Sequence, residues 1–139
     1  MTIITNSEAE TIQEGVTVGR KLESGMIVAL YGGLGAGKTA FTRGIALGLG
    51  INARISSPTF TIVNEYDGTI PLFHFDMYRL ESENELFDIG WDDYIERDGV
   101  CVVEWSEKAI GAIPPDAVKI KLENLGDDKR RLEIRLPIT

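Results

Sequence analysis

The 139-residue sequence predicts a three-layer α/β fold, in which a mixed β-sheet with a parallel centre lies between helices. Two apolar runs, Met26–Tyr31 and Val100–Trp105, have the length and continuity of strands that are buried on both faces. The first run leads into a glycine-rich segment and then into a stretch with helical spacing of apolar residues. A strand, a glycine loop and a helix in succession are typical of parallel sheets that bind ligands at their carboxyl edge.

The elements before the first buried strand are predicted to be an edge strand and a helix. Thr2–Thr5 has the composition of a short strand. Ser7 and Glu10 are spaced as in a capping box, and they open a helix that we expect to run to about Leu22. A Ser-Gly pair then turns the chain into the buried strand.

The middle of the chain is predicted to hold a helix, an extended segment and a hairpin. Ala40–Leu49 follows the glycine-rich segment and has helical spacing of apolar residues. Arg54–Thr59 is expected to be extended, because the residue before a proline avoids the helical conformation. Thr59–Tyr66 and Ile70–Tyr78 are β-rich runs on either side of an Asp-Gly turn, which is typical of a hairpin.

Two short helices and a second hairpin complete the predicted fold. Glu83–Ile89 and Trp91–Ile95 are expected to be helical, and they precede the second buried strand. Ala117–Leu122 and Arg131–Leu136 alternate apolar and polar residues around a Gly-Asp-Asp turn, as the strands of a half-buried hairpin do. We expect all of these elements to form a single domain over residues 1–139.

The composition is that of an ordinary globular protein, with 43% hydrophobic and 26% charged residues. Lys and Glu interrupt the apolar runs before they reach membrane-spanning length, and the N-terminal residues lack the pattern of a secretion signal. A single histidine and a single cysteine, Cys101, exclude a structural zinc site, and Cys101 is expected to be a buried apolar side chain. We therefore expect a cytoplasmic protein that does not associate with membranes.

The charge is distributed unevenly around a net value of −8. Residues 65–107 hold thirteen Asp or Glu against two arginines, whereas residues 119–135 are rich in Lys and Arg. The acidic stretch is interpreted as a solvated face, with a docking surface for a basic partner as the alternative. Because an acidic protein binds polyphosphate backbones poorly, any RNA is expected to be bound mainly by partner proteins.

Residues 32–39 read Gly-Gly-Leu-Gly-Ala-Gly-Lys-Thr and match the phosphate-loop pattern G-x-x-x-x-G-K-[ST] at every fixed position. The glycines let the backbone bend around a triphosphate. Lys38 is expected to reach the β- and γ-phosphates, and the hydroxyl of Thr39 to hold Mg²⁺. A glycine-rich turn with an incidental lysine is the alternative, and it leaves the flanking strand and helix unexplained. The predicted fold is therefore that of a P-loop NTPase.

Two carboxylates are candidates to complete a magnesium site. Phosphate-loop enzymes supply an acidic residue from the end of a neighbouring strand. Glu104 follows four apolar residues at the end of a predicted strand, and this favours a functional role over that of an exposed strand-end acid. Asp76 also ends a predicted strand, but for it both interpretations stay open.

Other polar and aromatic residues have two interpretations each. Ser56–Thr61 is either a loop that senses the γ-phosphate or a plain polar loop. His74 is expected to be a partly buried strand residue, with a catalytic role as the alternative. Trp91 and Trp105 are expected to pack rather than to bind a ligand. Arg130 either contacts a nucleotide or is a surface arginine.

Missing motifs narrow the class of phosphate-loop protein. The sequence has no Asn-Lys-x-Asp motif, which GTPases use to recognise their base, and the chain is short for a motor or ring ATPase. Residues 80–115 hold no cluster of arginines of the kind found in the lid of small-molecule kinases.

Four segments together resemble the TsaE (YjeE) family: Gly32–Thr39, Ser57–Thr61, Phe73–Arg79 and Val103–Trp105. The resemblance implies an ATPase that is needed for threonylcarbamoyladenosine formation at adenosine 37 of bacterial tRNA, and that acts with TsaD and TsaB. It further implies that the protein does not itself transfer the threonylcarbamoyl group. We expect slow intrinsic ATP hydrolysis that partner proteins stimulate.

The resemblance also implies roles for individual residues. Thr39 and Glu104 match the Mg²⁺ ligands of the family, and Asp76 matches a second acid, so that Lys38, Asp76 and Glu104 are the catalytic candidates. Thr59 and Thr61 match a switch-like loop, and Gly33 stands where the family usually has Asp. The candidates for ATP binding are Glu8, Leu34, Gly35, Ala36, Gly37, Lys38, Thr39 and Arg130.

Three hypotheses about function follow. The first is a Mg²⁺-dependent ATPase that serves as an accessory subunit of the tRNA-modifying assembly. The second is a binding switch in which nucleotide occupancy, without required hydrolysis, controls partner docking. The third is a small-molecule P-loop kinase.

Overall fold

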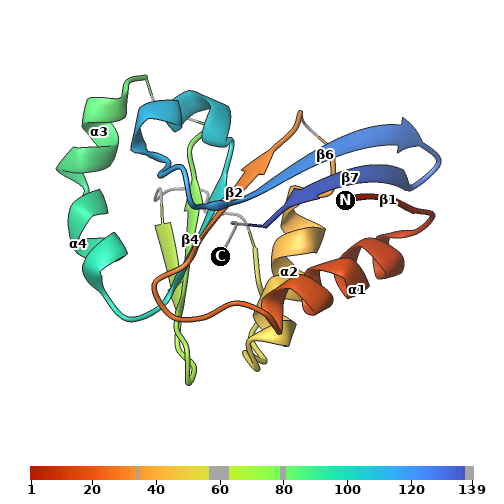
Figure 1. Cartoon of the computed structure of the whole chain (residues 1–139), viewed down its shortest axis with the longest axis horizontal. Coiled ribbons are helices and arrows are strands. Elements are labelled where there is room, and N and C mark those ends of the chain that lie inside the picture. Colours follow the sequence, from red (N-terminus) through yellow and green to blue (C-terminus); the bar gives the residue numbers. More distant parts are fainter. Residues whose placement is uncertain (34, 57–62, 79–80, 137–139) are drawn as a thin grey trace.

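The computed structural model describes residues 1–33, 35–56, 63–78 and 81–136. Within them, seven strands form one mixed sheet in the order β1-β7-β6-β2-β5-β4-β3 (Figure 1). The strands are β1 (Thr2–Thr5), β2 (Ile27–Tyr31), β3 (Val63–Tyr66), β4 (Leu72–Asp76), β5 (Val100–Glu104), β6 (Val118–Gly126) and β7 (Lys129–Arg135). The helices are α1 (Glu8–Gly19), α2 (Lys38–Gly48), α3 (Glu83–Asp88), α4 (Trp91–Glu96) and the 3-10 helix η1 (Ser106–Ala112).

The centre of the sheet is parallel, as predicted. Strand β2 pairs in parallel with β5 and β6, and β5 pairs in parallel with β4. The outer pairs β1–β7, β6–β7 and β3–β4 are antiparallel. The three-layer α/β fold with a mixed, centrally parallel sheet is thus confirmed.

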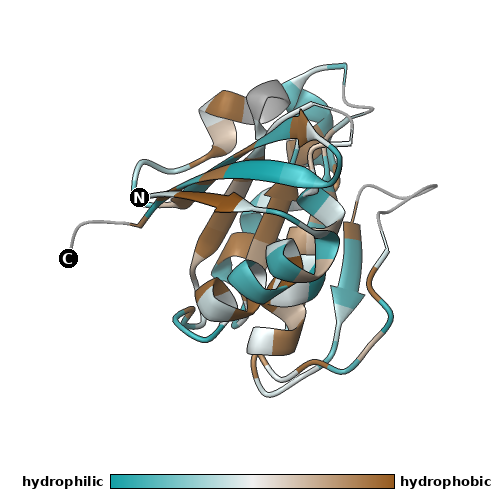
Figure 2. Ribbon diagram, turned by 90° about the vertical axis from the view of Figure 1, so that its right-hand side faces the viewer, coloured by the Kyte–Doolittle hydropathy of each residue, from teal (hydrophilic) through white to brown (hydrophobic). Residues whose placement is uncertain are grey.

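Two apolar cores lie on opposite faces of the sheet, and they explain the three layers. Phe41 and Ile45 of α2 pack in one core with Val28 and Val102 of the sheet, on the face that α1 and α2 cover. The second core contains Phe75 of β4, which contacts the ring of Trp91 of α4 edge to face at a centroid distance of 5.1 Å. Figure 2 shows the hydrophobic residues concentrated in the central strands between the helices. The packing role predicted for Trp91 agrees with this position.

Several element boundaries differ from the prediction. Helix α1 has Ser7 as its N-cap, as predicted, but it ends at Gly19 rather than near Leu22. Strand β5 ends at Glu104, because Trp105 adopts the left-handed conformation with φ of 59°. The 3-10 helix η1 that follows has no counterpart in the predicted elements.

The second hairpin is longer than predicted, with strands Val118–Gly126 and Lys129–Arg135. Asp127 and Asp128 form its turn with φ values of 49° and 65°. Positive φ at both central residues of a two-residue turn matches the twist of the strands.

The single cysteine is a buried side chain, as predicted. Cys101 is buried in β5, and this burial raises the pKa of its thiol to about 12. The thiol is therefore protonated at neutral pH and is a poor nucleophile. Among the residues that the structure describes, no helix has the length and apolar character needed to cross a membrane.

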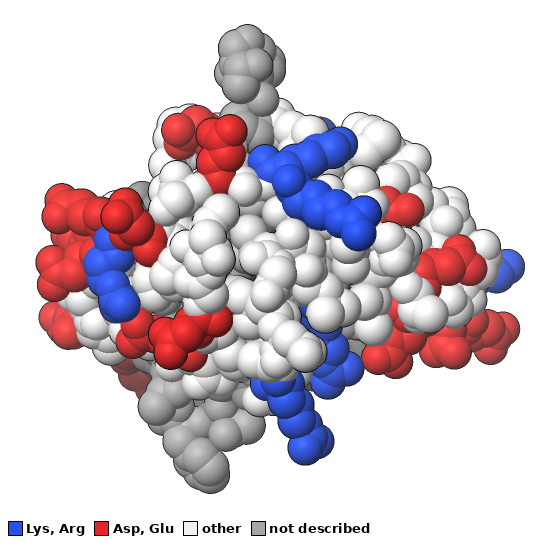
Figure 3. All heavy atoms as spheres, turned by 90° about the horizontal axis from the view of Figure 1, so that it is seen from below, with Lys and Arg blue, Asp and Glu red and all other residues white. Residues whose placement is uncertain are grey.

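The acidic stretch forms a surface at one end of the molecule. Figure 3 shows acidic side chains gathered over α3 and α4. These two helices contribute Glu83, Glu85, Asp88, Asp92, Asp93 and Glu96. Arg97 lies beside them and pairs with Glu65 of β3 at 2.8 Å.

Helices α1 and α2 approach so closely that glycine is required at their contact. A Cβ atom added to Gly44 would lie 2.0 Å from the carbonyl oxygen of Ile12, and one added to Gly15 would lie 2.3 Å from that of Phe41. Both obstacles are backbone atoms, so a side chain there forces the helices apart. This contact positions α2, whose N-terminus adjoins the phosphate-loop motif.

We predict that Gly44→Ala lowers the free energy of unfolding by about 2 kcal/mol or more, as overpacking of a tight contact does. Equilibrium urea denaturation measures this change. Gly33→Ala is the matched control, because a Cβ at Gly33 meets nothing within 4 Å. Equal stability of the Gly44→Ala variant and the original protein would contradict the close packing of α1 on α2.

Candidate phosphate-binding site

The glycine motif lies between β2 and α2, at the carboxyl edge of the parallel strands. Gly35 and Gly37 have φ values of 71° and 96°, which side chains disfavour, and Gly37 is the N-cap of α2. Gly32 is needed for space, because a Cβ there would lie 2.4 Å from the carbonyl oxygen of Leu122. A helix that begins at a glycine loop favours an anion at its N-terminus.

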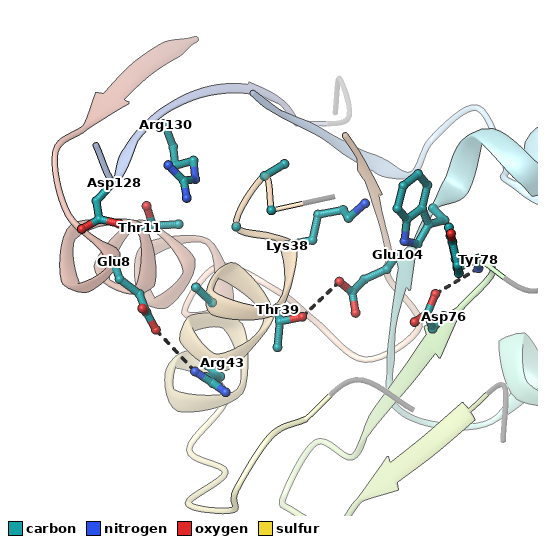
Figure 4. Close-up of a pocket in the computed structure, with 15 residues that line it drawn as sticks. Glu8, Thr11, Lys38, Thr39, Arg43, Asp76, Tyr78, Glu104, Asp128 and Arg130 are labelled. Atoms are coloured by element: carbon teal, nitrogen blue, oxygen red, sulfur yellow. Dashed lines mark hydrogen bonds and ion pairs between the residues drawn. The ribbon is translucent and has the colours of Figure 1, made fainter. Parts of the chain in front are cut away.

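A pocket of about 410 Å³ opens over this loop (Figure 4). It gathers residues from α1, the glycine loop, α2, the ends of β4 and β5, and the β6–β7 turn. Nine residues predicted from the sequence line it: Glu8, Gly35, Ala36, Gly37, Lys38, Thr39, Asp76, Glu104 and Arg130. The structure therefore brings together candidates that lie up to 122 positions apart, from 8 to 130.

Glu104 is held between two side chains at the floor of the pocket. Its Oε1 accepts a hydrogen bond from the Thr39 hydroxyl at 3.4 Å, and its Oε2 lies 2.6 Å from Nε2 of His74. Only 3% of Glu104 is exposed, so the carboxylate depends on these partners rather than on bulk water. The predicted role at the end of a buried strand is compatible with this geometry.

Asp76 lies opposite Glu104 in the parallel pairing of β4 with β5. One of its carboxylate oxygens accepts a hydrogen bond from the backbone N–H of Tyr78 at 3.0 Å. Its pKa is raised above the usual 3.8, mainly because burial disfavours the charged form, and the nearby charge of Glu104 adds to the rise. Asp76 is thus a pocket carboxyl that takes up a proton more readily than an exposed one.

Lys38 lies across the pocket and contacts an aromatic ring. Its ammonium group donates a hydrogen bond to the carbonyl oxygen of Gly32 and sits 3.4 Å from the ring centroid of Trp105. Such a cation–π contact stabilises the ammonium group. Trp105 also contacts the ring of Tyr78 at a centroid distance of 4.9 Å. The prediction that Trp105 only packs is therefore incomplete, because its ring lines the pocket.

Charged side chains border the opposite end of the pocket. Glu8 of α1 and Arg43 of α2 form an exposed ion pair at 3.4 Å. Arg130 of β7 donates a hydrogen bond to the side chain of Asn124 at 3.1 Å, and Asn124 donates one to the carbonyl oxygen of Gly35 at 3.2 Å. Arg130 is thereby tied to the glycine loop.

Some pocket residues were not predicted from the sequence. Arg43, Thr11 and Asp128 line the pocket but stand outside every motif, whereas Tyr78 lies within the Phe73–Arg79 segment but was not chosen as a site residue. A signal for Arg43 exists, because it lies four positions after Thr39 and so on the same face of α2. No local pattern identifies Thr11 and Asp128, since α1 and the β6–β7 turn reach the pocket only through the folding of the sheet.

His74 was expected to be partly buried, and it is completely buried in β4, with 0% exposure. Leu34 and the Ser57–Thr61 segment lie outside the described residues, and so does Arg79.

The donor atoms at Thr39 and Glu104 fit a small hard cation. Hydroxyl and carboxylate oxygens are the ligands that Mg²⁺ prefers, and it is usually held by few protein groups together with phosphate oxygens. In the described part of the chain, no group of three or more His, Cys, Asp or Glu is arranged to hold a metal ion.

Comparison with known proteins identifies the family. The family model described as "Threonylcarbamoyl adenosine biosynthesis protein TsaE" matches residues 5–132. The chain belongs to the TsaE family. The resemblance carried by the four sequence segments is thus confirmed.

Members of the TsaE family from distant bacteria are similar over most of the chain. The tRNA threonylcarbamoyladenosine biosynthesis protein TsaE of Treponema pallidum is 44% identical over 134 residues, which cover 96% of this chain and 99% of that protein. The protein of the same name from Bacillus subtilis is 48% identical over 109 residues, covering 78% and 68%. A crystal structure of YdiB from Bacillus subtilis superposes with a TM-score of 0.81 at 36% identity, covering 96% of this chain and 83% of that one.

We predict that ADP changes the fluorescence of Trp105, because a phosphate group that engages Lys38 draws its ammonium group away from the indole ring. Titration of tryptophan emission with ADP measures this response. The Trp91→Phe variant is expected to keep it, and the Trp105→Phe variant to lose it. A response that survives in Trp105→Phe would contradict the assignment.

Proposed function

We propose that this protein is a Mg²⁺-dependent ATPase that acts with TsaB and TsaD in the formation of threonylcarbamoyladenosine at position 37 of tRNA. One observation carries the proposal: Lys38 and Thr39 of the phosphate-loop motif share a pocket with the strand-end acid Glu104. Membership of the TsaE family supports the pathway, since the named relatives are tRNA threonylcarbamoyladenosine biosynthesis proteins.

The shape of the pocket supports one orientation of ATP. The phosphates would lie on the glycine loop and the N-terminus of α2, where backbone N–H groups and Lys38 neutralise negative charge. The base would lie toward the other end of the pocket, which Glu8, Arg43 and Arg130 border. The planar guanidinium of Arg130 is suited to stacking on a base or pairing with a phosphate.

Thr39 and Glu104 would hold the magnesium ion. When bound, Mg²⁺ neutralises charge that develops on the transferred phosphoryl group. The protein's contribution is to fix the hydroxyl of Thr39 and one oxygen of Glu104 beside the phosphate loop, 3.4 Å apart.

Asp76 is the proposed acceptor of a proton from the attacking water. Its raised pKa makes the ionised carboxylate a stronger base than an exposed aspartate. The bond from the N–H of Tyr78 engages one of its oxygens. The water would attack the γ-phosphate in line with the departing ADP, with Lys38 stabilising the negative charge.

Partner proteins are proposed to complete the reaction and to hold the tRNA. Among the residues that the structure describes, the arginines that line the pocket are Arg43 and Arg130, and they border the end opposite Lys38. Slow hydrolysis by the isolated chain, stimulated by TsaB and TsaD, agrees with that arrangement. The net charge of −8 makes a broad RNA surface on this subunit unfavourable, so tRNA contacts are assigned mainly to the partners.

A nucleotide-dependent switch is the second candidate, and the contact of Lys38 with Trp105 favours it. If phosphates draw Lys38 off the ring, the strand end at Trp105 differs between the free and bound states. Nucleotide binding without hydrolysis would then change the surface at Trp105 that a partner could contact. Glu104→Ala separates the two functions: full support of tRNA modification by a variant that binds but does not hydrolyse ATP would favour the switch.

We predict that TsaB and TsaD increase the ATPase rate of the protein. Lys38→Ala is expected to lower the stimulated rate roughly 100-fold or more, because the ammonium group no longer stabilises the negative charge of the transition state. Phosphate release assays measure the rate, and tRNA modification in the reconstituted assembly measures the outcome.

Gly33→Ala is the control for this experiment, because its position lies in the same loop, a Cβ there meets nothing within 4 Å, and it is expected to leave the rate unchanged. The proposal is wrong if the partners give no stimulation and Lys38→Ala leaves tRNA modification intact.

A further inference from the structure

His74 lies beneath the pocket, in contact with the carboxylate that is proposed to hold Mg²⁺. We propose that His74 is a positioning residue: it occupies one oxygen of Glu104, so that the other oxygen alone faces the cation, and it thereby favours Mg²⁺ over Ca²⁺. The inference rests on the proposed function for the presence of a cation, but the contact between His74 and Glu104 is a feature of the chain itself.

The contact is short and secluded. Nε2 of His74 lies 2.6 Å from Oε2 of Glu104, and the two side chains are 0% and 4% exposed. A hydrogen bond to a carboxylate in such a dry environment is stronger than one at the surface. The other oxygen of Glu104, Oε1, lies 3.4 Å from the Thr39 hydroxyl, on the side of the phosphate loop. The two oxygens of one carboxylate therefore have different partners.

Strand pairing fixes this arrangement. In the parallel register of β4 with β5, His74 lies opposite Val102 and Asp76 lies opposite Glu104. The imidazole thus reaches a residue two positions further along the neighbouring strand, on the same face of the sheet. Because both strands are fully paired and buried around the contact, neither side chain can turn away without disturbing the core.

The partners of the imidazole ring select one tautomer. An ionised carboxylate only accepts hydrogen bonds, so Nε2 must carry the hydrogen of the bond that Oε2 of Glu104 accepts. Nδ1 is buried and has no hydrogen-bond partner among the described residues. A hydrogen on Nε2 thus places a ring donor where the carboxylate acceptor lies.

The different partners of the two oxygens bear on the choice of metal. Ca²⁺ takes six to eight oxygen ligands and is often bound by both oxygens of a carboxylate, whereas Mg²⁺ demands compact octahedral coordination. With Oε2 engaged by His74, Glu104 offers a single oxygen, which suits Mg²⁺ and deprives Ca²⁺ of a ligand. Removal of a group that hydrogen-bonds to a metal-ligating side chain typically lowers metal affinity about 10- to 100-fold.

The first test examines the hydrogen bond without nucleotide or metal. Since the chain has one histidine, its ring nitrogens give unambiguous signals in ¹⁵N NMR spectra of labelled protein. We expect the Nε2–H tautomer, with a ring proton that exchanges slowly with water. A proton on Nδ1 instead of Nε2 would overturn the proposal.

The second test compares Mg²⁺ and Ca²⁺. Calorimetric titration gives the affinity for ADP with each cation and with neither. His74→Phe removes the donor, and we expect it to reduce the preference for Mg²⁺ over Ca²⁺ about tenfold or more while leaving metal-free ADP binding unchanged. His74→Gln supplies an amide N–H that can reach Glu104, and it is expected to restore most of the preference.

An unchanged Mg²⁺ to Ca²⁺ ratio in His74→Phe would overturn the proposal. So would an equal loss in His74→Gln, since that result would show a requirement for the ring shape and not for the donor. If His74→Phe does not fold, the Mg²⁺ to Ca²⁺ ratio of His74→Gln and the tautomer seen by NMR still test the proposal. Failure of the unaltered protein to bind ADP with any cation would instead refute the proposed function, and the tautomer would remain a separate measurement.

Discussion

The parallel pairing of β2, β5 and β4 is the constraint on which the site depends. These strands end at one edge of the sheet, and their register places Asp76 directly opposite Glu104. The glycine loop leaves β2 at the same edge. Lys38 and Thr39 therefore lie in the same pocket as the two acids. The strand interiors are buried between two apolar cores, and burial prevents the strands from slipping in register. Packing of the sheet therefore sets the geometry of the pocket.

The charged side chains of Lys38 and Glu104 are buried at this edge of the sheet. Since water cannot solvate them there, contacts with neighbouring groups stabilise their charges. Glu104 has the imidazole of His74 and the hydroxyl of Thr39. Lys38 has the carbonyl oxygen of Gly32 and the face of Trp105. The partners of Glu104 do not have to reorient when a charged ligand binds, whereas Lys38 is expected to exchange the ring of Trp105 for a phosphate group. The other end of the pocket, bordered by Arg43 and Arg130, lies more open to solvent.

Much of this fold follows from local sequence patterns. The phosphate loop and the buried strands are each visible within a few residues, because glycine conformation and apolar continuity are local properties. Glu104 could be selected as a site residue because a carboxylate at the end of an apolar strand has few other roles. The contact between His74 and Glu104 could not be predicted, since it depends on the register of two strands that are 30 residues apart. The boundary at Trp105 also escaped prediction, because its left-handed φ of 59° is unusual for a tryptophan.

The assignment of the site can be tested by a crystal structure of the protein with a non-hydrolysable ATP analogue and Mn²⁺ in place of Mg²⁺, since anomalous scattering locates the metal. We predict phosphates on the loop that precedes α2, Lys38 at the phosphates rather than on Trp105, and a metal ion bound by Thr39 and by one oxygen of Glu104. A nucleotide bound elsewhere, or a metal ion that neither residue contacts, would contradict the assignment.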